Sequence, residues 1–324
     1  MGDPDTSHMN FSSTSSNVTA VVRKPESFHT AVTKIVVTVA LFISINYING
    51  TLVHTFNKHQ ILHMNPRYIL FIHLVVNDMI QLTAAVTLFV YTYVFYTINV
   101  SLCCLLVISA VLTTQNTPLT LASMAAECYI AICLPLQHSK LCTAKRIYVT
   151  IGLMWLISAI SVLPDLFVLL ATEPLEYFYS RIVCLRHILF QNTALHEKNN
   201  LSNIVLLVIV WLCLVYTYLR ILFAAKAADG DAKKARNTIL LHGFQLLLCM
   251  LTYISPLLKQ ALLYWFPEHY RNSLFVCYII IQILPRLISP IVYGIRDQTF
   301  RRYLKRYLLC SVTANTTDYI ERHT

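Results

Sequence analysis

Seven long apolar blocks constrain the fold of this chain more than any other feature. They lie near residues 30–56, 67–93, 99–133, 147–170, 201–224, 237–262 and 272–295. Each block is long enough for the roughly 20 residues that a membrane-spanning helix needs. Because a backbone in lipid must satisfy its hydrogen bonds within the segment, we expect helices, and the alternating pattern of a β-barrel is absent. The blocks therefore predict an all-α membrane protein with seven spans.

The composition agrees with this class. Of the 324 residues, 56% are hydrophobic and only 12% are charged, whereas a soluble domain has about 25% charged residues. The formal net charge of +10 could indicate a nucleic-acid partner, but the basic residues lie in the short gaps between the apolar blocks. We therefore expect no nucleic acid among the partners.

The distribution of lysine and arginine predicts the orientation of the chain. With the N-terminus outside, 16 of the 25 basic residues lie on the cytoplasmic side, 8 lie outside, and Arg286 lies within the last block. Cytoplasmic loops carry the excess of Lys and Arg. We therefore expect a multi-pass protein of the plasma membrane with an extracellular N-terminus and a cytoplasmic C-terminus.

The blocks divide the chain into three parts. Residues 1–29 form a polar tail without the apolar core of a signal peptide, and its sequons predict glycosylation at Asn10 and Asn17. Residues 30–295 form the membrane domain. In residues 296–324, an apolar stripe at helical spacing lies opposite arginine and lysine side chains. This pattern predicts a short amphipathic helix on the inner leaflet, with membrane lipid as a partner.

Polar side chains inside the blocks are candidates for function, because charges within lipid are costly. At mid-membrane depth the sequence places Asn49, Asp78, Arg286 and Ser289, and Glu127 lies near the inner end of the third block. We expect the mid-membrane group to rearrange between two states, with Asp78 paired to Arg286. The alternative is a static ion pair that only holds helices together.

The cysteines indicate a disulfide. Of the 10 cysteines, only Cys103, Cys104 and Cys184 lie at or beyond the outer surface in this topology, where the oxidising environment allows disulfides to form. A bridge from Cys103 to Cys184 would hold the loop after the fourth block over the mouth of the bundle. Cys104 could compete for this bridge, and a free buried thiol is the alternative.

Other functional classes find little support in the sequence. No internal repeat relates the first three blocks to the last three, which disfavours a transporter or channel. There is no Ser/His/Asp set with a supporting motif, no phosphate-binding loop and no spacing of zinc ligands. We therefore expect no catalytic residues, no metal site and no cofactor.

Three segments carry a family resemblance: MAAECYIAICLPLQH, KARNTILLHGFQLLLC and PRLISPIVYGIRDQTFRRYL. Together they resemble the inner end of helix three, the start of helix six and the end of helix seven in rhodopsin-like G-protein-coupled receptors. More narrowly, they are similar to vertebrate odorant receptors of the fish type. The resemblance covers about residues 30–310 and implies a seven-transmembrane helix bundle with a short amphipathic eighth helix.

The resemblance assigns an activation switch to the end of the third block. Glu127 occupies the acidic position of the family's acid–Arg–Tyr motif, and Tyr129 matches its tyrosine. Cys128 stands where the family has arginine. That arginine holds the inactive state and contacts the G protein, so the departure puts the usual ionic lock in doubt.

A second switch lies in the seventh block. The family pattern Asn-Pro-x-x-Tyr becomes Ser289-Pro290-Ile291-Val292-Tyr293. Pro290 can still kink the helix, and Tyr293 can still swing as in the family.

The resemblance also implies a ligand cavity in the outer half of the bundle. Its expected lining residues are Ala110, Val111, Thr114, Gln115, Tyr253 and Leu257. Because no acid stands at position 110, an amine held by the family's usual aspartate is disfavoured. An apolar cavity with few hydroxyl groups suits a small neutral or weakly polar molecule.

The sequence thus predicts an odorant receptor. It would bind a small extracellular molecule and activate a heterotrimeric G protein, of the stimulatory type by resemblance. A rhodopsin-like receptor for a lipid or peptide differs only in its ligand, and a membrane transporter or channel is the alternative from another class.

Overall fold

The computed structural model describes residues 27–190, 193–227, 270–288 and 290, together with scattered positions between 243 and 266. These parts contain six helices that are long and apolar enough to cross a membrane. Four of them are α2 (Phe28–Lys58), α4 (Pro66–Val94), α5 (Val100–Cys133) and α7 (Ala144–Thr172). The fifth, Leu201–Ile221, lies within α10 (Thr193–Ala227), and the sixth, Tyr270–Ile288, contains α12 (Tyr270–Tyr278) and the π-helix η1 (Ile279–Ile283).

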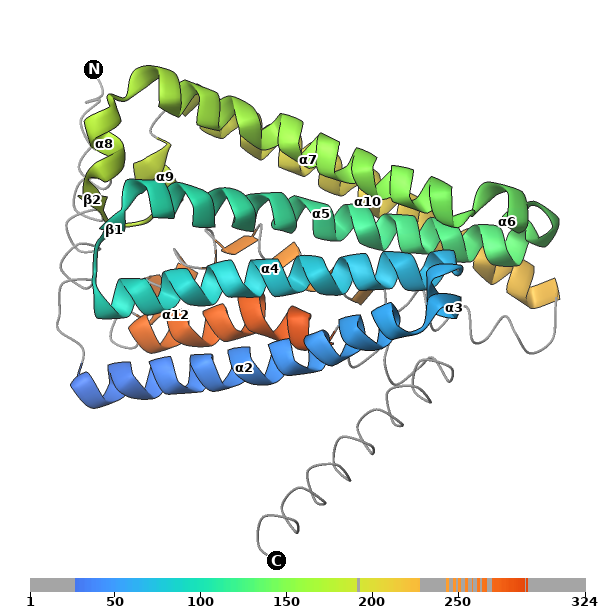
Figure 1. Ribbon diagram of the computed structural model, residues 1–324, viewed down its shortest axis with the longest axis horizontal. Helices are drawn as coiled ribbons and strands as arrows, with labels where there is room; N and C mark the ends of the chain where they lie inside the picture. Colours follow the sequence, from blue (N-terminus) through green and yellow to red (C-terminus); the bar gives the residue numbers. More distant parts are fainter. Residues whose placement is uncertain are drawn as a thin grey trace, which may run out of the picture.

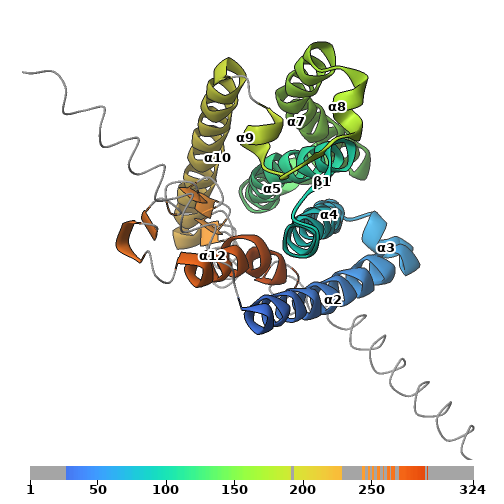
Figure 2. The ribbon, with the colours of Figure 1, turned by 90° about the vertical axis from the view of Figure 1, so that its left-hand side faces the viewer.

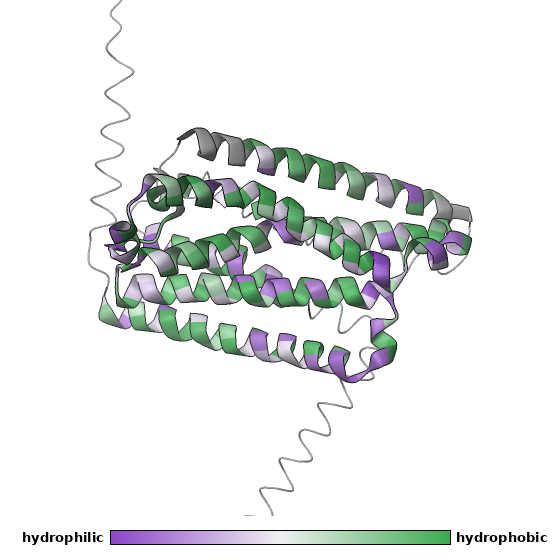
Figure 3. Cartoon of the chain, turned by 45° about the horizontal axis from the view of Figure 1, so that its top comes forward, coloured by the Kyte–Doolittle hydropathy of each residue, from purple (hydrophilic) through white to green (hydrophobic). Residues whose placement is uncertain are grey.

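These helices coincide with six of the seven predicted blocks. The block at 237–262 contains only scattered described positions, and the predicted amphipathic helix after residue 296 lies outside the described residues. The described helices mostly extend beyond the apolar blocks by a few residues, because polar residues continue the helix past the lipid. Figure 3 shows this distribution, with apolar residues along the helix bodies and hydrophilic residues concentrated toward the ends.

Short elements connect the spans. They are α3 (Gln60–His63), β1 (Ile98–Asn99), α6 (Pro135–Leu141), α8 (Leu175–Tyr179), β2 (Arg181–Ile182) and α9 (Arg186–Leu189). Strand β1 pairs with β2 in antiparallel register, with Ile98 opposite Ile182. We call the end of the bundle that holds this strand pair the outer end, and the end that holds α6 the inner end (Figure 1).

Local sequence signals fix where the spans begin. The Asn65 side chain accepts a hydrogen bond from the Arg67 N–H at 3.1 Å, and Pro66 occupies the first turn of α4. Asn99 caps α5 in the same way, accepting from the Ser101 N–H at 3.0 Å. An asparagine cap satisfies one of the free N–H groups at a helix start, and proline is tolerated there because its missing N–H would have no partner.

Helix α5 lies at the centre of the described bundle. It packs against α4, α7 and α10, while α2 and the α12–η1 segment pack near α4 (Figures 1 and 2). A large apolar cluster joins α2, α4, α5, α7 and α10 toward the inner half and includes Leu52, Leu74, Leu121, Met154 and Leu214. Polar groups on the buried faces of α5 can therefore reach three neighbouring helices.

Candidate functional site

A disulfide between Cys103 and Cys184 closes the outer end, as the sequence predicted. It joins residues 81 positions apart and ties the loop after α7 to the start of α5. Cys104, the possible competitor, is a buried free thiol. The Ser101 hydroxyl donates to the Phe178 carbonyl at 2.8 Å, which adds a second tie between the same loop and α5. The loop is thus fixed against the bundle at its outer end.

A small recess lies beside this disulfide. Its lining combines apolar and hydroxyl-bearing side chains and comprises Leu88, Tyr91, Thr92, Tyr96, Thr97, Ile98 and Cys184. Tyr96 adopts a φ of 59° in the turn between α4 and β1, a left-handed conformation that is uncommon for residues other than glycine. Of these lining residues, only Cys184 was predicted to have a role.

Below the outer end, Gln115 links three helices. Its amide group donates to the Ser161 hydroxyl of α7 at 3.1 Å and to the Asn203 side-chain oxygen of α10 at 2.9 Å. Thr114, the next residue of α5, points to α4 instead and accepts from the Gln81 amide at 2.6 Å. The two predicted ligand residues therefore serve two different helix interfaces.

The other predicted ligand residues have simpler surroundings. Val111 packs against the apolar cluster under the disulfide, and the Ala110 carbonyl accepts hydrogen bonds from the hydroxyls of Thr113 and Thr114. Tyr253 and Leu257 lie outside the described residues. Their place in a ligand cavity stays a prediction.

The mid-membrane polar residues are buried, as the depth of their positions suggested. Asn49 in α2, Asp78 in α4 and Arg286 beyond η1 are each at most 4% exposed. The Arg286 guanidinium donates from Nη1 to the Ile281 carbonyl of the π-helix at 2.8 Å. Pairing of Asp78 with Arg286 stays a prediction.

The second predicted switch is described only in part. Pro290 is buried, whereas Ser289 and Tyr293 lie outside the described residues. The π-helix that precedes Pro290 was not predicted. Such single-turn π segments occur frequently at functional sites.

A partly buried polar network that the sequence did not reveal surrounds His73. The Trp155 indole N–H of α7 donates to His73 Nε2 at 3.0 Å, and His73 Nδ1 lies 3.2 Å from the Thr120 hydroxyl of α5. Since an indole can only donate, Nε2 must accept and Nδ1 carries the proton of a neutral ring. The Thr120 hydroxyl in turn donates to the Asn116 carbonyl at 2.8 Å. His73 therefore ties α4, α5 and α7 together.

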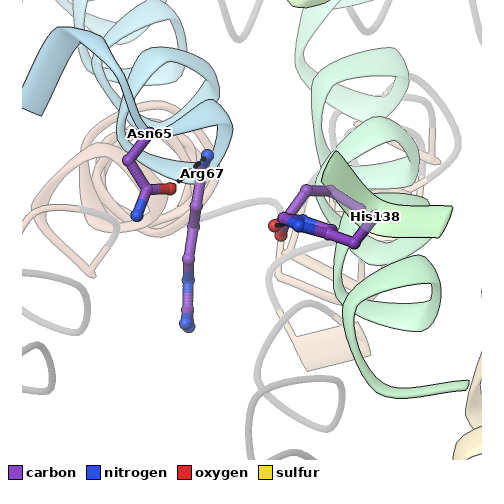
Figure 4. Close-up of polar contacts among 4 residues, drawn as sticks. Asn65, Arg67 and His138 are labelled. Carbon is purple, nitrogen blue, oxygen red and sulfur yellow. Dashed lines mark hydrogen bonds and ion pairs between the residues drawn. The ribbon is translucent and has the colours of Figure 1, made fainter. Parts of the chain in front are cut away.

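At the inner end, Glu127 contacts a histidine from the following loop. His138 of α6 lies with Nε2 3.2 Å from the Glu127 carboxylate, and the two side chains are 30% and 9% exposed. Figure 4 shows the His138 ring at this contact, with the Arg67 side chain of α4 lying apart from it. Burial, followed by the nearby Glu127 carboxylate, raises the pKa of the Cys142 thiol just after α6.

The neighbours of Glu127 in the predicted motif face α10. Cys128 and Tyr129 pack with Ile221 and Tyr218, and the rings of Tyr129 and Tyr216 lie 6.0 Å apart. The motif thus divides between two contacts, the acid toward α6 and the tyrosine toward α10.

Two charges within the spans are buried although the sequence did not predict it: Asp165 received no role, and Lys34 was counted among the eight basic residues on the outside. Asp165 lies on the buried stripe of α7, and Lys34 lies in α2 with its ammonium 5.7 Å from the centre of the Phe275 ring. Both are at most 5% exposed. The signal was present, because each is a single charge inside an otherwise apolar block.

Comparison with known proteins places these features in a family. A sequence model of the 7 transmembrane receptor (rhodopsin family) matches residues 48–293. Odorant receptor 131-2 of Danio rerio is 32% identical over 271 residues, which cover 82% of this chain and 83% of that protein. Olfactory receptor 51Q1 of Homo sapiens is 26% identical over 58% of this chain and 61% of its own length. A second human protein, olfactory receptor 13J1, is 22% identical over 65% of this chain and 68% of its own length.

Proposed function

This chain belongs to the rhodopsin family of seven-transmembrane receptors, and on that premise we propose that it is an odorant receptor. It is a multi-pass membrane protein of a receptor family rather than an enzyme. The observation that carries the proposal is its 32% identity, over 82% of its length, to a zebrafish protein that is itself an odorant receptor. The ligand is a small extracellular molecule, and the partner inside the cell is a heterotrimeric G protein.

The ligand binds in the outer half of the bundle, beneath the loop that the Cys103–Cys184 disulfide fixes. Gln115 supports this position, because its amide reaches polar groups on both α7 and α10. A ligand that carries a hydrogen-bonding group can replace one of these contacts without leaving the amide unsatisfied. Ala110, Val111 and Thr114 line the same stretch of α5, and Tyr253 and Leu257 complete the site from the sixth span.

The G protein, of the stimulatory type, docks at the inner end. With the inner end facing the cytoplasm, the N-terminus is extracellular, the C-terminus is cytoplasmic, and the chain resides in the plasma membrane. The inner surface offers the Leu136 side chain, which is 91% exposed on α6, beside exposed Lys140, Lys145 and Arg146. An exposed apolar side chain rimmed by basic groups fits a partner surface that is partly apolar and partly acidic.

Ligand binding and G-protein docking are coupled through two bundle arrangements. The ligand binds one arrangement more tightly, and its differential affinity shifts the population toward it. Asn49, Asp78 and Arg286, with Ser289, Pro290 and Tyr293 beyond them, form the mid-membrane part of this switch. Glu127, Cys128 and Tyr129 form its inner part.

Cyclic AMP production in cells expressing this chain tests the proposal. The cells are challenged with pooled amino acids, bile acids and small volatile compounds, beside mock-transfected cells and a Cys128→Arg variant. A response that requires the chain supports an odorant receptor. Silence of both the native chain and the variant, with surface expression confirmed by antibody labelling, would count against odorant reception but not against the seven-helix fold.

A further inference from the structure

We propose that the contact between Glu127 and His138 is the inner lock of this receptor and that it replaces the missing arginine at position 128. The inference rests on the proposed function, because a lock has meaning only for a bundle that opens toward a partner. His138 is then a positioning residue. It keeps α6 against the inner end of α5 until a ligand shifts the bundle.

Glu127 is buried and needs a hydrogen-bond donor. Its side chain is 9% exposed at the inner end of an apolar helix, where a carboxylate without a donor is costly. The next residue, Cys128, carries a thiol, which is a weak donor and provides no positive charge. The carboxylate therefore depends on a donor from another element.

His138 supplies that donor from α6. Leu134 ends α5 and Pro135 begins α6, so the chain turns sharply and brings position 138 back toward Glu127. The carboxylate can only accept, so the imidazole Nε2–H donates across the 3.2 Å contact. Cys142 is the other titratable group on the α6 side that interacts with Glu127, and its raised pKa keeps it a neutral thiol. Lys140, on the same short helix, is exposed to solvent.

The contact favours the closed arrangement for a physical reason. When the inner ends separate to admit a partner, water reaches Glu127 and the carboxylate no longer needs the imidazole. An interaction that is strong in one arrangement and dispensable in the other shifts the equilibrium toward the first. The same short helix carries Leu136, which is exposed already, so release of His138 lets this apolar side chain move with α6 toward a partner.

The rate at which N-ethylmaleimide alkylates Cys142 provides a test that is independent of signalling. Cys142 is buried directly after α6, so separation of α6 from α5 exposes its thiol. In purified receptor, followed by mass spectrometry of the peptide, His138→Ala should accelerate alkylation about threefold to tenfold, as expected for loss of one interhelical contact in a membrane. His138→Gln should alkylate at the native rate, because its Nε2 amide can donate at the same place. Lys140→Ala, which removes a neighbouring cation without touching Glu127, is the matched control.

Basal cyclic AMP is measured in the same variants, normalised to surface expression. We expect His138→Ala to raise it by a similar factor and His138→Gln to leave it at the native level. If His138→Ala fails to reach the membrane, the double variant Glu127→Gln/His138→Ala removes the buried carboxylate together with its donor. Its alkylation rate is compared with that of Glu127→Gln/His138→Gln. The two double variants have the same residue at position 127, so that residue influences the Cys142 thiol equally in both.

The outcomes separate the lock from the proposed function. Unchanged alkylation in His138→Ala overturns the lock. The lock is also overturned if the native receptor responds to ligand while His138→Ala has the same basal cyclic AMP as the native receptor. Accelerated alkylation with no signal from any variant or ligand supports the closing contact and instead contradicts the proposed function.

Discussion

The hydrogen bond between Trp155 and His73 provides a quantitative test of the polar network around His73. Trp155→Phe keeps an aromatic ring against the imidazole, which the indole meets edge-on at a centroid distance of 6.2 Å. It removes only the indole N–H, which donates to His73 Nε2 at 3.0 Å. The ring nitrogen then loses its donor inside a span, while the Nδ1 contact to Thr120 stays in place.

The expected cost follows from the position of the bond. Hydrogen bonds between helices in a membrane contribute about 0.6 kcal/mol on average and at most about 1.7 kcal/mol. A buried acceptor left unsatisfied adds part of its desolvation cost, of the order of 1 kcal/mol. We therefore expect Trp155→Phe to lower the free energy of unfolding by about 1 to 2 kcal/mol.

The assay is unfolding of purified receptor in detergent, arranged as a double-mutant cycle of Trp155→Phe and His73→Leu. The pair should show a coupling energy of about 1 kcal/mol, because either change alone removes the same bond. Trp265→Phe is the control, since Trp265 is exposed, and should cost less than about 0.5 kcal/mol. Additive single effects, or a Trp155→Phe protein as stable as the native one, would refute the network.

Three further perturbations test other parts of the structure. Cys184→Ser removes a disulfide between residues 81 positions apart. Such a disulfide contributes at most about 4.5 kcal/mol of stability, and less here because the helices that it joins stay formed in lipid. We expect lower surface expression by flow cytometry for Cys184→Ser and no such loss for Cys104→Ser. Gln115→Leu removes two hydrogen bonds to neighbouring helices, so unfolding should become easier by about 1 kcal/mol, and ligand dose–response curves should shift to higher concentration. Exchanging the charges as Asp78→Arg with Arg286→Asp should restore surface expression that either single reversal abolishes, and failure of that rescue would argue against their pairing.

The sequence was sufficient to predict the spans because their signal is a sum over about 20 residues. An average of that kind tolerates single exceptions, which is why the block at 147–170 was recognised although it contains Asp165. The same averaging hides the exceptions themselves, so Asp165 went unremarked and Lys34 was counted as lying outside, although both side chains are buried. Most described helix ends lie within a few residues of the predicted blocks, but α10 begins at Thr193, well before the block at 201–224, because polar residues continue this helix.

Side-chain partners could not be predicted in the same way. Gln115 was expected to face a cavity, but the rotation of α5 directs its amide toward both α7 and α10, and rotation depends on packing with neighbours. Glu127 was recognised by motif, whereas its partner His138 depends on how the chain turns at Pro135. The Cys103–Cys184 bridge was predictable because topology left only three cysteines at the outer surface.

The central claim, that this chain couples a small external ligand to a G protein, is tested most directly with purified components. The receptor is placed in lipid nanodiscs with a stimulatory heterotrimer, and nucleotide exchange on the α subunit is followed with and without a ligand identified by the cell screen. The account predicts that ligand accelerates exchange in the native receptor, despite Cys128, and that Cys184→Ser weakens the effect. Ligand that binds the receptor but leaves the exchange rate unchanged would contradict the account.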